Sequence, residues 1–186
     1  MTLPTVKKLA VVAAAAASSV VTPHVARAQT SAPAAQAQPA SGRMMALLID
    51  AEGLPAADLQ RAAAAAQKFI QEKMASEDRV ALLISTAKGI DVRQDFTTDR
   101  DLLVKTAADL AYFPGTNPAD ATEEWATALS AALKILSQIE GKKMIVGITN
   151  VKSLPTEKLQ DLIGAAIHAN VAIYNVDASV YLPNRR

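Results

Sequence analysis

The 186-residue sequence contains no cysteine, so a disulfide framework, a thiolate metal site and a cysteine nucleophile are all excluded. Aromatic residues are scarce, at 4% of the chain, and the formal net charge is only +1. A near-neutral chain with scattered basic residues lacks the electrostatic footprint of a nucleic-acid-binding protein. The fold must therefore be stabilised by apolar packing, and nucleic acid is not an expected partner.

Glycine is also scarce, and its seven residues form neither G-x-G-x-x-G nor G-x-x-x-x-G-K-[ST]. In those motifs the glycines let backbone amides approach phosphates, so their absence gives no support to nucleotide binding. Histidine is nearly absent too, because His168 is the only one beyond residue 24. A lone imidazole cannot build a multi-histidine metal site. We expect His168 in the last turn of a helix, beside free carbonyl groups.

The first 28 residues predict a secretory signal peptide. Lys7 and Lys8 precede the 13-residue run LAVVAAAAASSVV, and Ala26 and Ala28 form an A-x-A cleavage site. The run is shorter than the roughly 20 apolar residues that span a bilayer. We therefore expect cleavage after Ala28 and a periplasmic or secreted mature chain without a transmembrane segment. An uncleaved anchor is the alternative.

Residues 29–42, QTSAPAAQAQPASG, carry no charge and no large apolar side chain. Such a segment cannot bury enough surface to offset its ordering entropy, so we expect a disordered Ala/Pro/Gln linker. The remainder, 43–186, is predicted to form one domain that buries about two thirds of its unfolded surface. Without residues 1–28 the chain has 16 basic and 18 acidic residues, which is still close to neutral.

Apolar runs and amphipathic segments alternate along 43–186. Continuous apolar runs are typical of strands covered on both faces, and they occur at 44–50, 79–85, 142–150 and 171–177. The alternating segment 90–96 suits an exposed edge strand that forms a hairpin with 79–85. Apolar spacings of three and four residues predict four helices: 55–75, a helix within 97–113 capped by Thr98 or Asp99, 119–139, and one from Pro155 to a left-handed cap at Asn170.

This order of elements predicts the α/β class. We expect a three-layer, Rossmann-like, mostly parallel sheet with helices on both faces and one antiparallel edge strand. The first strand ends on Asp50, and crossovers around it would put its carboxyl end at a topological switch point. Ligands of open α/β sheets bind at such points, so Asp50 is the first candidate site residue.

The chain resembles the von Willebrand factor A (VWA) domain, in the divergent VWFA-related form of exported bacterial proteins. The resemblance is carried by LLIDAEGLPAADLQRAAAAAQKFIQEKM, DRVALLISTAKGIDVRQDFTTDRDLL and IHANVAIYNVDA, which together span about 44–178. It implies the strand order 3-2-1-4-5. It also implies a metal-ion-dependent adhesion site (MIDAS) on the rim, built from Asp-x-Ser-x-Ser, a loop threonine and a later aspartate.

Carried over by position, Asp50 matches the first aspartate of that site, and Glu52 and Leu54 replace the two serines. Thr116 in PGTNP matches the loop threonine, and Asn150 stands where the last aspartate belongs. Leucine cannot ligate, and a second carboxylate lowers the attraction of the ion for an acidic partner. The resemblance thus implies a degenerate MIDAS. Its metal ligands would be Asp50, Glu52 and Thr116, weakly holding Mg²⁺ or another divalent cation, and its binding residues Asn150, Asp50 and Thr116.

A structural interpretation of the same residues stays open. Asp50 and Asn150 would then hydrogen-bond to loop amides, and Thr116 would cap the central helix. Ser85 and Lys88 at a strand end form a further candidate, since Ser–Lys nucleophiles exist, although no oxyanion-loop signature accompanies them.

The function expected from these features is that of an exported, non-enzymatic VWA-like binding module for protein–protein interaction. The alternative is a small periplasmic hydrolase or metal-dependent enzyme that uses the rim around Asp50 and Glu52. A strongly raised carboxylate pKa or an enclosed rim pocket would favour the enzyme. A third possibility is a remnant of the family with purely structural duties.

The end of the sequence raises a separate expectation. A full VWA domain continues past its fifth strand with another helix, strand and helix, whereas nine residues follow Asp177 here. The resemblance therefore implies a C-terminally shortened domain with strand 171–176 at an edge. An exposed edge invites pairing, so we expect it to be covered by 178–186 or by a partner strand.

Overall fold

The computed structural model of the protein describes residues 42–115 and 121–178. The expected signal peptide, nearly all of the expected linker, Thr116 and the segment 179–186 lie outside these ranges. Among the described helices, none combines the length and the apolarity needed to cross a bilayer.

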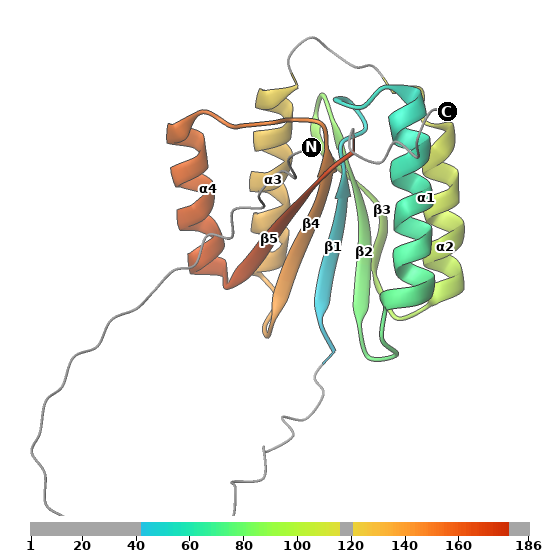
Figure 1. Ribbon diagram of the computed structural model, residues 1–186. Coiled ribbons are helices and arrows are strands. Elements are labelled where there is room, and N and C mark those ends of the chain that lie inside the picture. The colour runs from blue at the N-terminus through green and yellow to red at the C-terminus, as the bar shows by residue number, and fades with distance from the viewer. Residues whose placement is uncertain (1–41, 116–120, 179–186) are drawn as a thin grey trace, which may run out of the picture. The chain divides into compact units, whose positions relative to one another are not determined.

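Five strands and four α-helices make up the described part of the chain (Figure 1). The strands are β1 (Met44–Ile49), β2 (Arg79–Thr86), β3 (Gly89–Thr97), β4 (Lys143–Thr149) and β5 (Val171–Asp177). The helices are α1 (Ala56–Lys73), α2 (Arg100–Asp109), the short 3₁₀ helix η1 (Leu110–Tyr112), α3 (Thr122–Ser137) and α4 (Thr156–Ala169). The helix expected at 119–139 is thus described from Thr122 to Ser137.

The strands form one sheet in the order β3-β2-β1-β4-β5. Strand β1 pairs in parallel with β2 and β4, and β4 pairs in parallel with β5. Strand β3 is antiparallel to β2, as expected for a hairpin. The predicted fold class is therefore confirmed: a mostly parallel α/β sheet with one antiparallel edge strand.

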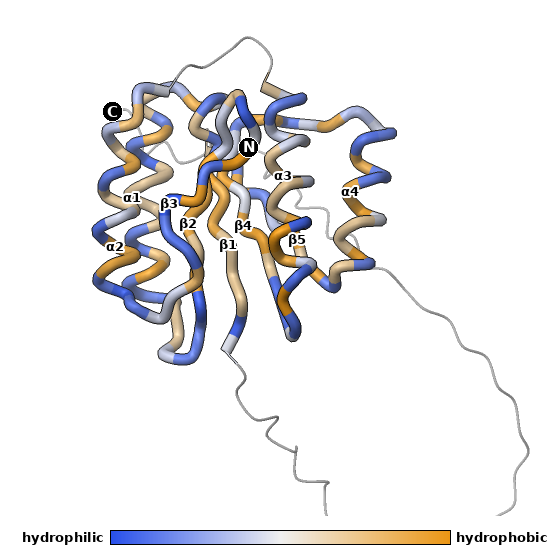
Figure 2. Tube along the Cα trace, turned by 180° about the vertical axis from the view of Figure 1, so that it is seen from behind, coloured by the Kyte–Doolittle hydropathy of each residue, from blue (hydrophilic) through white to orange (hydrophobic). Residues whose placement is uncertain are grey.

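The helices cover the sheet from both faces, α1 and α2 on one side and α3 and α4 on the other (Figure 1). Successive side chains of β1 enter different cores, with Met45 and Leu47 on the α1/α2 side and Ala46 and Leu48 on the α3/α4 side. Because both faces are buried, the strand is apolar throughout. Figure 2 shows the contrast with β3, which is largely hydrophilic at the sheet edge.

The expected helix ends are present. The Asp99 carboxylate accepts a hydrogen bond from the Leu102 amide at 2.9 Å, so Asp99 caps α2. Asn170 ends α4 with φ of 53°, in the left-handed region that asparagine tolerates. These caps set the lengths of the helices and hence the positions of the loops at the two ends of the sheet.

The amino ends of β1 and β2 are joined by an ion pair between buried Asp78 and half-exposed Arg43. The Asp78 carboxylate accepts hydrogen bonds from the Arg43 amide and Nε, both at 3.0 Å, from Arg43 Nη2, and from the Ala75 amide at 2.9 Å. Hydrogen bonding from the Arg43 side chain lowers the pKa of Asp78 to about 2. The pair fixes where both strands begin.

Candidate functional site at the carboxyl ends of the central strands

Three small polar residues follow the same register position in the three central strands. Ile49 of β1 is paired with Ile84 of β2 and with Ile148 of β4. The residues that come next are Asp50, Ser85 and Thr149, and all three are buried. Because parallel strands end at the same edge of a sheet, these side chains meet at the switch point next to β1.

The carboxylate of Asp50 accepts three hydrogen bonds there. The Ser85 hydroxyl donates to Oδ1 at 2.8 Å, and the Thr149 hydroxyl donates to Oδ2 at 2.7 Å. The Gly53 amide donates to Oδ1 at 2.8 Å. We call these four residues the Asp50 cluster. Its donors are two hydroxyls and an amide, and no salt bridge to Asp50 is formed within 42–115 and 121–178, so three adjacent strands are tied at one point by neutral donors.

The turn after β1 lies directly on this carboxylate. A Cβ atom at Gly53 would stand 2.2 Å from Asp50 Oδ2 and 2.9 Å from the Ala121 Cβ, so the backbone approaches as only glycine allows. The next residue, Leu54, is fully buried in the core between the sheet and α1. The position of the second serine of the adhesion motif is therefore a packing position here.

Glu52 and Asn150 lie beside the cluster rather than in it. The Glu52 carboxylate accepts a hydrogen bond at 3.1 Å from the Ala87 amide, in the turn between β2 and β3. Asn150 follows β4 and is half-buried. Within 42–115 and 121–178, no three Asp, Glu or His side chains are placed so that they could hold a metal ion together. Because Thr116 lies outside those ranges, metal ligation by Asp50, Glu52 and Thr116 stays a prediction.

The structure adds Ser85 and Thr149 to the predicted site as partners of Asp50. Ser85, which the sequence offers as a candidate nucleophile with Lys88, is buried and donates its hydroxyl hydrogen to Asp50. The signal was present in the strand endings LLID, LLIS and VGIT, each with a small polar residue after isoleucine. Only the register between strands identifies these endings as neighbours.

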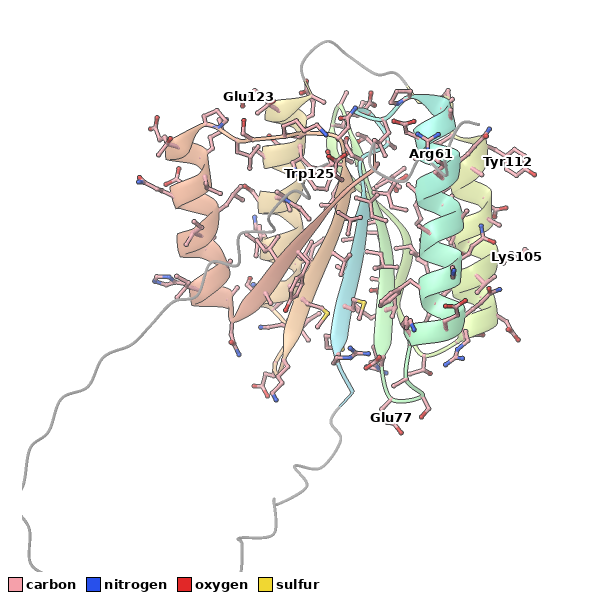
Figure 3. The ribbon with its side chains drawn as sticks, viewed as in Figure 1. Arg61, Glu77, Lys105, Tyr112, Glu123 and Trp125 are labelled. Carbon is pink, nitrogen blue, oxygen red and sulfur yellow. The ribbon has the colours of Figure 1, made fainter. Side chains whose placement is uncertain are left out.

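Ion pairs surround the rim. Arg61 pairs with Asp58 on α1, and Lys158 at the start of α4 pairs with Glu123 on α3. Figure 3 shows Arg61 and Glu123 near the same end of the sheet but on its opposite faces. The rim therefore carries charges of both signs, and these are paired.

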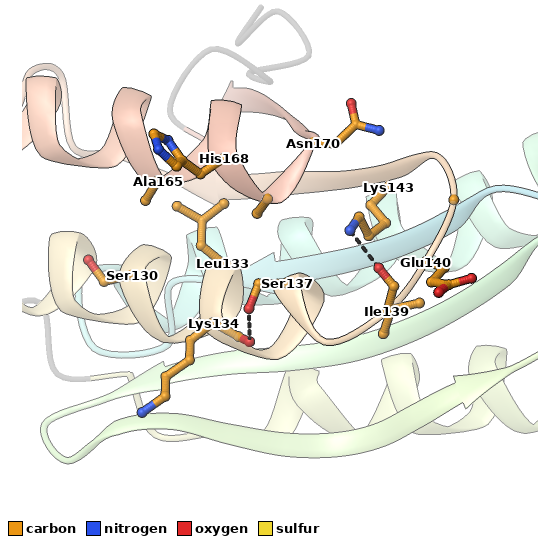
Figure 4. Close-up of a pocket in the computed structure, with 12 residues that line it drawn as sticks. Ser130, Leu133, Lys134, Ser137, Ile139, Glu140, Lys143, Ala165, His168 and Asn170 are labelled. Carbon is orange, nitrogen blue, oxygen red and sulfur yellow. Dashed lines mark hydrogen bonds between the residues drawn. The ribbon is translucent and has the colours of Figure 1, made fainter.

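The largest cavity lies at the other end of the sheet. It has a volume of about 540 Å³ between the C-terminal parts of α3 and α4 (Figure 4). Lys143, at the start of β4, lines this cavity. Its Nζ donates a hydrogen bond to the Ile139 carbonyl oxygen at 2.6 Å. Neither Asp50 nor Glu52 lines any of the five main cavities formed by the described residues.

Comparison with known proteins supports the fold. A von Willebrand factor type A protein from Catenulispora acidiphila superposes with a TM-score of 0.54 and 19% identity over 73% of this chain. The match spans 33% of the Catenulispora protein, about a third of its length. The SpRpn10 VWA domain gives a TM-score of 0.42 at 14% identity, over 76% of this chain and 90% of that one. No protein-family model and no curated protein matches the sequence.

Proposed function

We propose that this chain, which has a von Willebrand factor A-type fold, is an exported, non-enzymatic module for protein–protein interaction. In this proposal, hydrogen bonds instead of a metal ion hold its rim together. The contact surface is the rim around Asp50, Glu52 and Asn150. In this proposal the adhesion site is degenerate, and its aspartate has a structural role.

The hydrogen bonding of the Asp50 carboxylate carries the proposal. Both oxygens already accept hydrogen bonds, two on Oδ1 and one on Oδ2, from groups that are themselves buried. A cation at this carboxylate would have to displace hydroxyl donors and be partly dehydrated, and Mg²⁺ gives up its water reluctantly. The Gly53 backbone also lies directly against the carboxylate. Metal binding is therefore expected to be very weak.

The absence of catalysis is inferred from the placement of the two carboxylates. General acid–base work requires a carboxyl group that reaches a substrate proton. Asp50 is fully buried, and Glu52 is engaged with the Ala87 amide of the hairpin turn. The two groups are thus tied to different parts of the rim, which favours a binding surface over a catalytic pair.

The test combines metal binding with partner capture. Titration calorimetry of the full chain with Mg²⁺ and Mn²⁺, beside Asp50→Asn, is expected to give no binding heat at millimolar ion. Proteins captured by the tagged full chain from extracts of exported proteins should then be retained in EDTA. An isotherm that disappears in Asp50→Asn would overturn the proposal of a metal-free rim.

A pair of charge reversals tests the rim itself. Lys88→Glu changes the exposed turn between β2 and β3, next to the Ala87 amide that binds Glu52, whereas Lys105→Glu changes an exposed position partway along α2, away from the rim (Figure 3). The rim variant is expected to lose captured partners that the α2 variant keeps. Equal capture by both variants would contradict rim binding.

A further inference from the structure

The two edges of the sheet differ in how they are protected. The outer strand β3 carries Asp91, Arg93 and Asp95, and its pairing with β2 has two register shifts. Charges and irregular pairing are the usual protection against edge-to-edge association. Strand β5, VAIYNVD, has no charge before Asp177, no proline and an unbroken register with β4. Among the described strands, β4 is its one neighbour.

Apolar side chains flank the β5 edge on both faces of the sheet. On the α1/α2 side, Tyr174 and Val176 are exposed beyond the reach of those helices. On the other side, Leu159, Ile163 and Ile167 form a stripe along α4, each member four positions after the one before it. These five side chains are between 43% and 72% exposed, an unusual concentration for a free surface.

The α4 stripe and β5 line one groove. It has a volume of about 360 Å³, and Ile173 and Asn175 of β5 form the wall opposite Ile163 and Ile167. The groove therefore lies against the face of β5 that α4 covers, and β5 is the last strand in the sheet order, at the sheet edge. A strand added to that edge would therefore place alternate side chains in this groove and against Tyr174 and Val176.

The backbone of β5 determines which groups face outward. The Ala178 amide donates to the Thr149 carbonyl at 2.9 Å, so even-numbered residues of β5 turn their N–H and C=O groups toward β4. The odd-numbered residues, including Ile173 and Asn175, direct theirs away from β4. These are the groups that an added strand would bond.

We propose that the occupant of this edge is a second copy of the chain, whose β5 pairs antiparallel with the first around a two-fold axis at Tyr174. In this register Ile173 lies opposite Asn175 of the partner subunit and Val171 opposite Asp177, so the outward-facing residues fall in hydrogen-bonded pairs. The even-numbered Tyr174 falls in a non-hydrogen-bonded pair with its own copy, about 4.5 Å apart at Cα.

Charge and symmetry favour this occupant. A two-fold axis normal to the sheet keeps each face on its own side, so the two α4 stripes lie on one face of the joined sheet and the two Tyr174 rings on the other. Asp177, the only charged residue of β5, lies opposite Val171 and not opposite its own copy. The edge is therefore complementary to itself, without the like-charge contact that would oppose pairing.

This inference rests on the proposed interaction role and deepens it by naming one partner, a second copy of the chain. The surface concerned is the edge of β5, which is separate from the rim around Asp50. The first experiment measures the mass of the full chain by sedimentation equilibrium. We expect a dimer, and we expect Tyr174→Lys to raise its dissociation constant about tenfold or more, because two ammonium groups would face each other. Tyr112→Lys, at a fully exposed position on η1, is the matched control and should leave the dimer unchanged.

A cysteine scan tests the register, since the chain contains no other thiol. Tyr174→Cys should form an intermolecular disulfide under mild oxidation, because the paired Cβ atoms lie within bonding reach. Val176→Cys lies opposite residue 172 and should cross-link far more slowly. Equal cross-linking of both variants, or cross-linking of Tyr112→Cys, would overturn the proposed register.

Hydrogen exchange distinguishes the other occupants. In the dimer, the Ile173 and Asn175 amides should be protected at high protein concentration and lose protection on dilution. Protection in a monomer that disappears when 179–186 is deleted would assign the edge to the chain's own tail and overturn the proposal. A monomer with fast exchange at both amides would overturn it too, since the edge would then be free for a foreign strand.

Discussion

Two buried aspartates hold the two ends of the sheet, and they are held in different ways. Asp50, at the carboxyl end of β1, accepts from two hydroxyls and an amide among the described residues. Asp78, at the amino end of β2, accepts from the Arg43 guanidinium and from two backbone amides. Both are nearly inaccessible to solvent, at 0% and 2% exposure.

The difference shows what each residue can be used for. The Asp78 charge is compensated by a cation, and its pKa is depressed to about 2 because Arg43 donates to it. In the part of the chain that the structure describes, no cation pairs with Asp50, and its charge is met by donors from β2, β4 and the turn after β1, which meet at one point. A motif that binds metal in other proteins is thereby consistent with a structural role here, with neutral donors around the carboxylate.

The largest expected loss of stability follows from a change at Asp50, at the carboxyl end of β1. Asp50→Ala leaves the Ser85 and Thr149 hydroxyls and the Gly53 amide buried without their acceptor, which should cost about 3–5 kcal/mol of unfolding free energy. Urea unfolding followed by the fluorescence of Trp125, the single tryptophan, measures this loss. A cost below about 1 kcal/mol would mean that the cluster does not organise the sheet.

A smaller loss is expected when the cover of the Asp50 cluster is changed. Gly53→Ala places a methyl group 2.2 Å from the Asp50 carboxylate and should destabilise the fold by about 1–3 kcal/mol, through displacement of the turn. Gly164→Ala, at a helical glycine with open space around it, is the control and should not destabilise the fold. Thermal unfolding measures the stability of both variants. Equal melting temperatures for Gly53→Ala and Gly164→Ala would contradict the close approach of the Gly53 backbone to Asp50.

The smallest loss of stability is expected at the Arg43–Asp78 pair, at the amino ends of β1 and β2, and it appears only in acid. The pKa of Asp78 is about 2 in the folded chain and near 3.8 when unfolded, so the ion pair contributes its full stability above about pH 4. That contribution, about 1–2 kcal/mol after allowance for the half-exposed Arg43, is lost as the pH falls toward 2. Urea midpoints across this range should fall more steeply for the parent than for Arg43→Met. Parallel pH profiles would show that Arg43 does not depress this pKa.

The elements could be predicted from the sequence because local signals agree with the tertiary fold. Strands covered on both faces are continuous apolar runs, and Asp99 and Asn170 mark helix ends through their own backbone preferences. Asp50 could likewise be placed at the rim, since the end of a central parallel strand is a switch point. Its partners could not be found in this way, because Ser85 and Thr149 lie 35 and 99 residues away in the chain.

The sequence by itself therefore determined the elements, the mostly parallel sheet and the candidate residue Asp50, because these follow from periodicity and from short-range backbone preferences. Only the tertiary structure decided that the Asp50 carboxylate accepts hydrogen bonds from the Ser85 and Thr149 hydroxyls, that the Gly53 backbone lies against it, and that α4 and β5 together expose an apolar edge. Each of these depends on strand register and on which helices cover which strands. Such relations join residues far apart in the chain, and no local pattern encodes them.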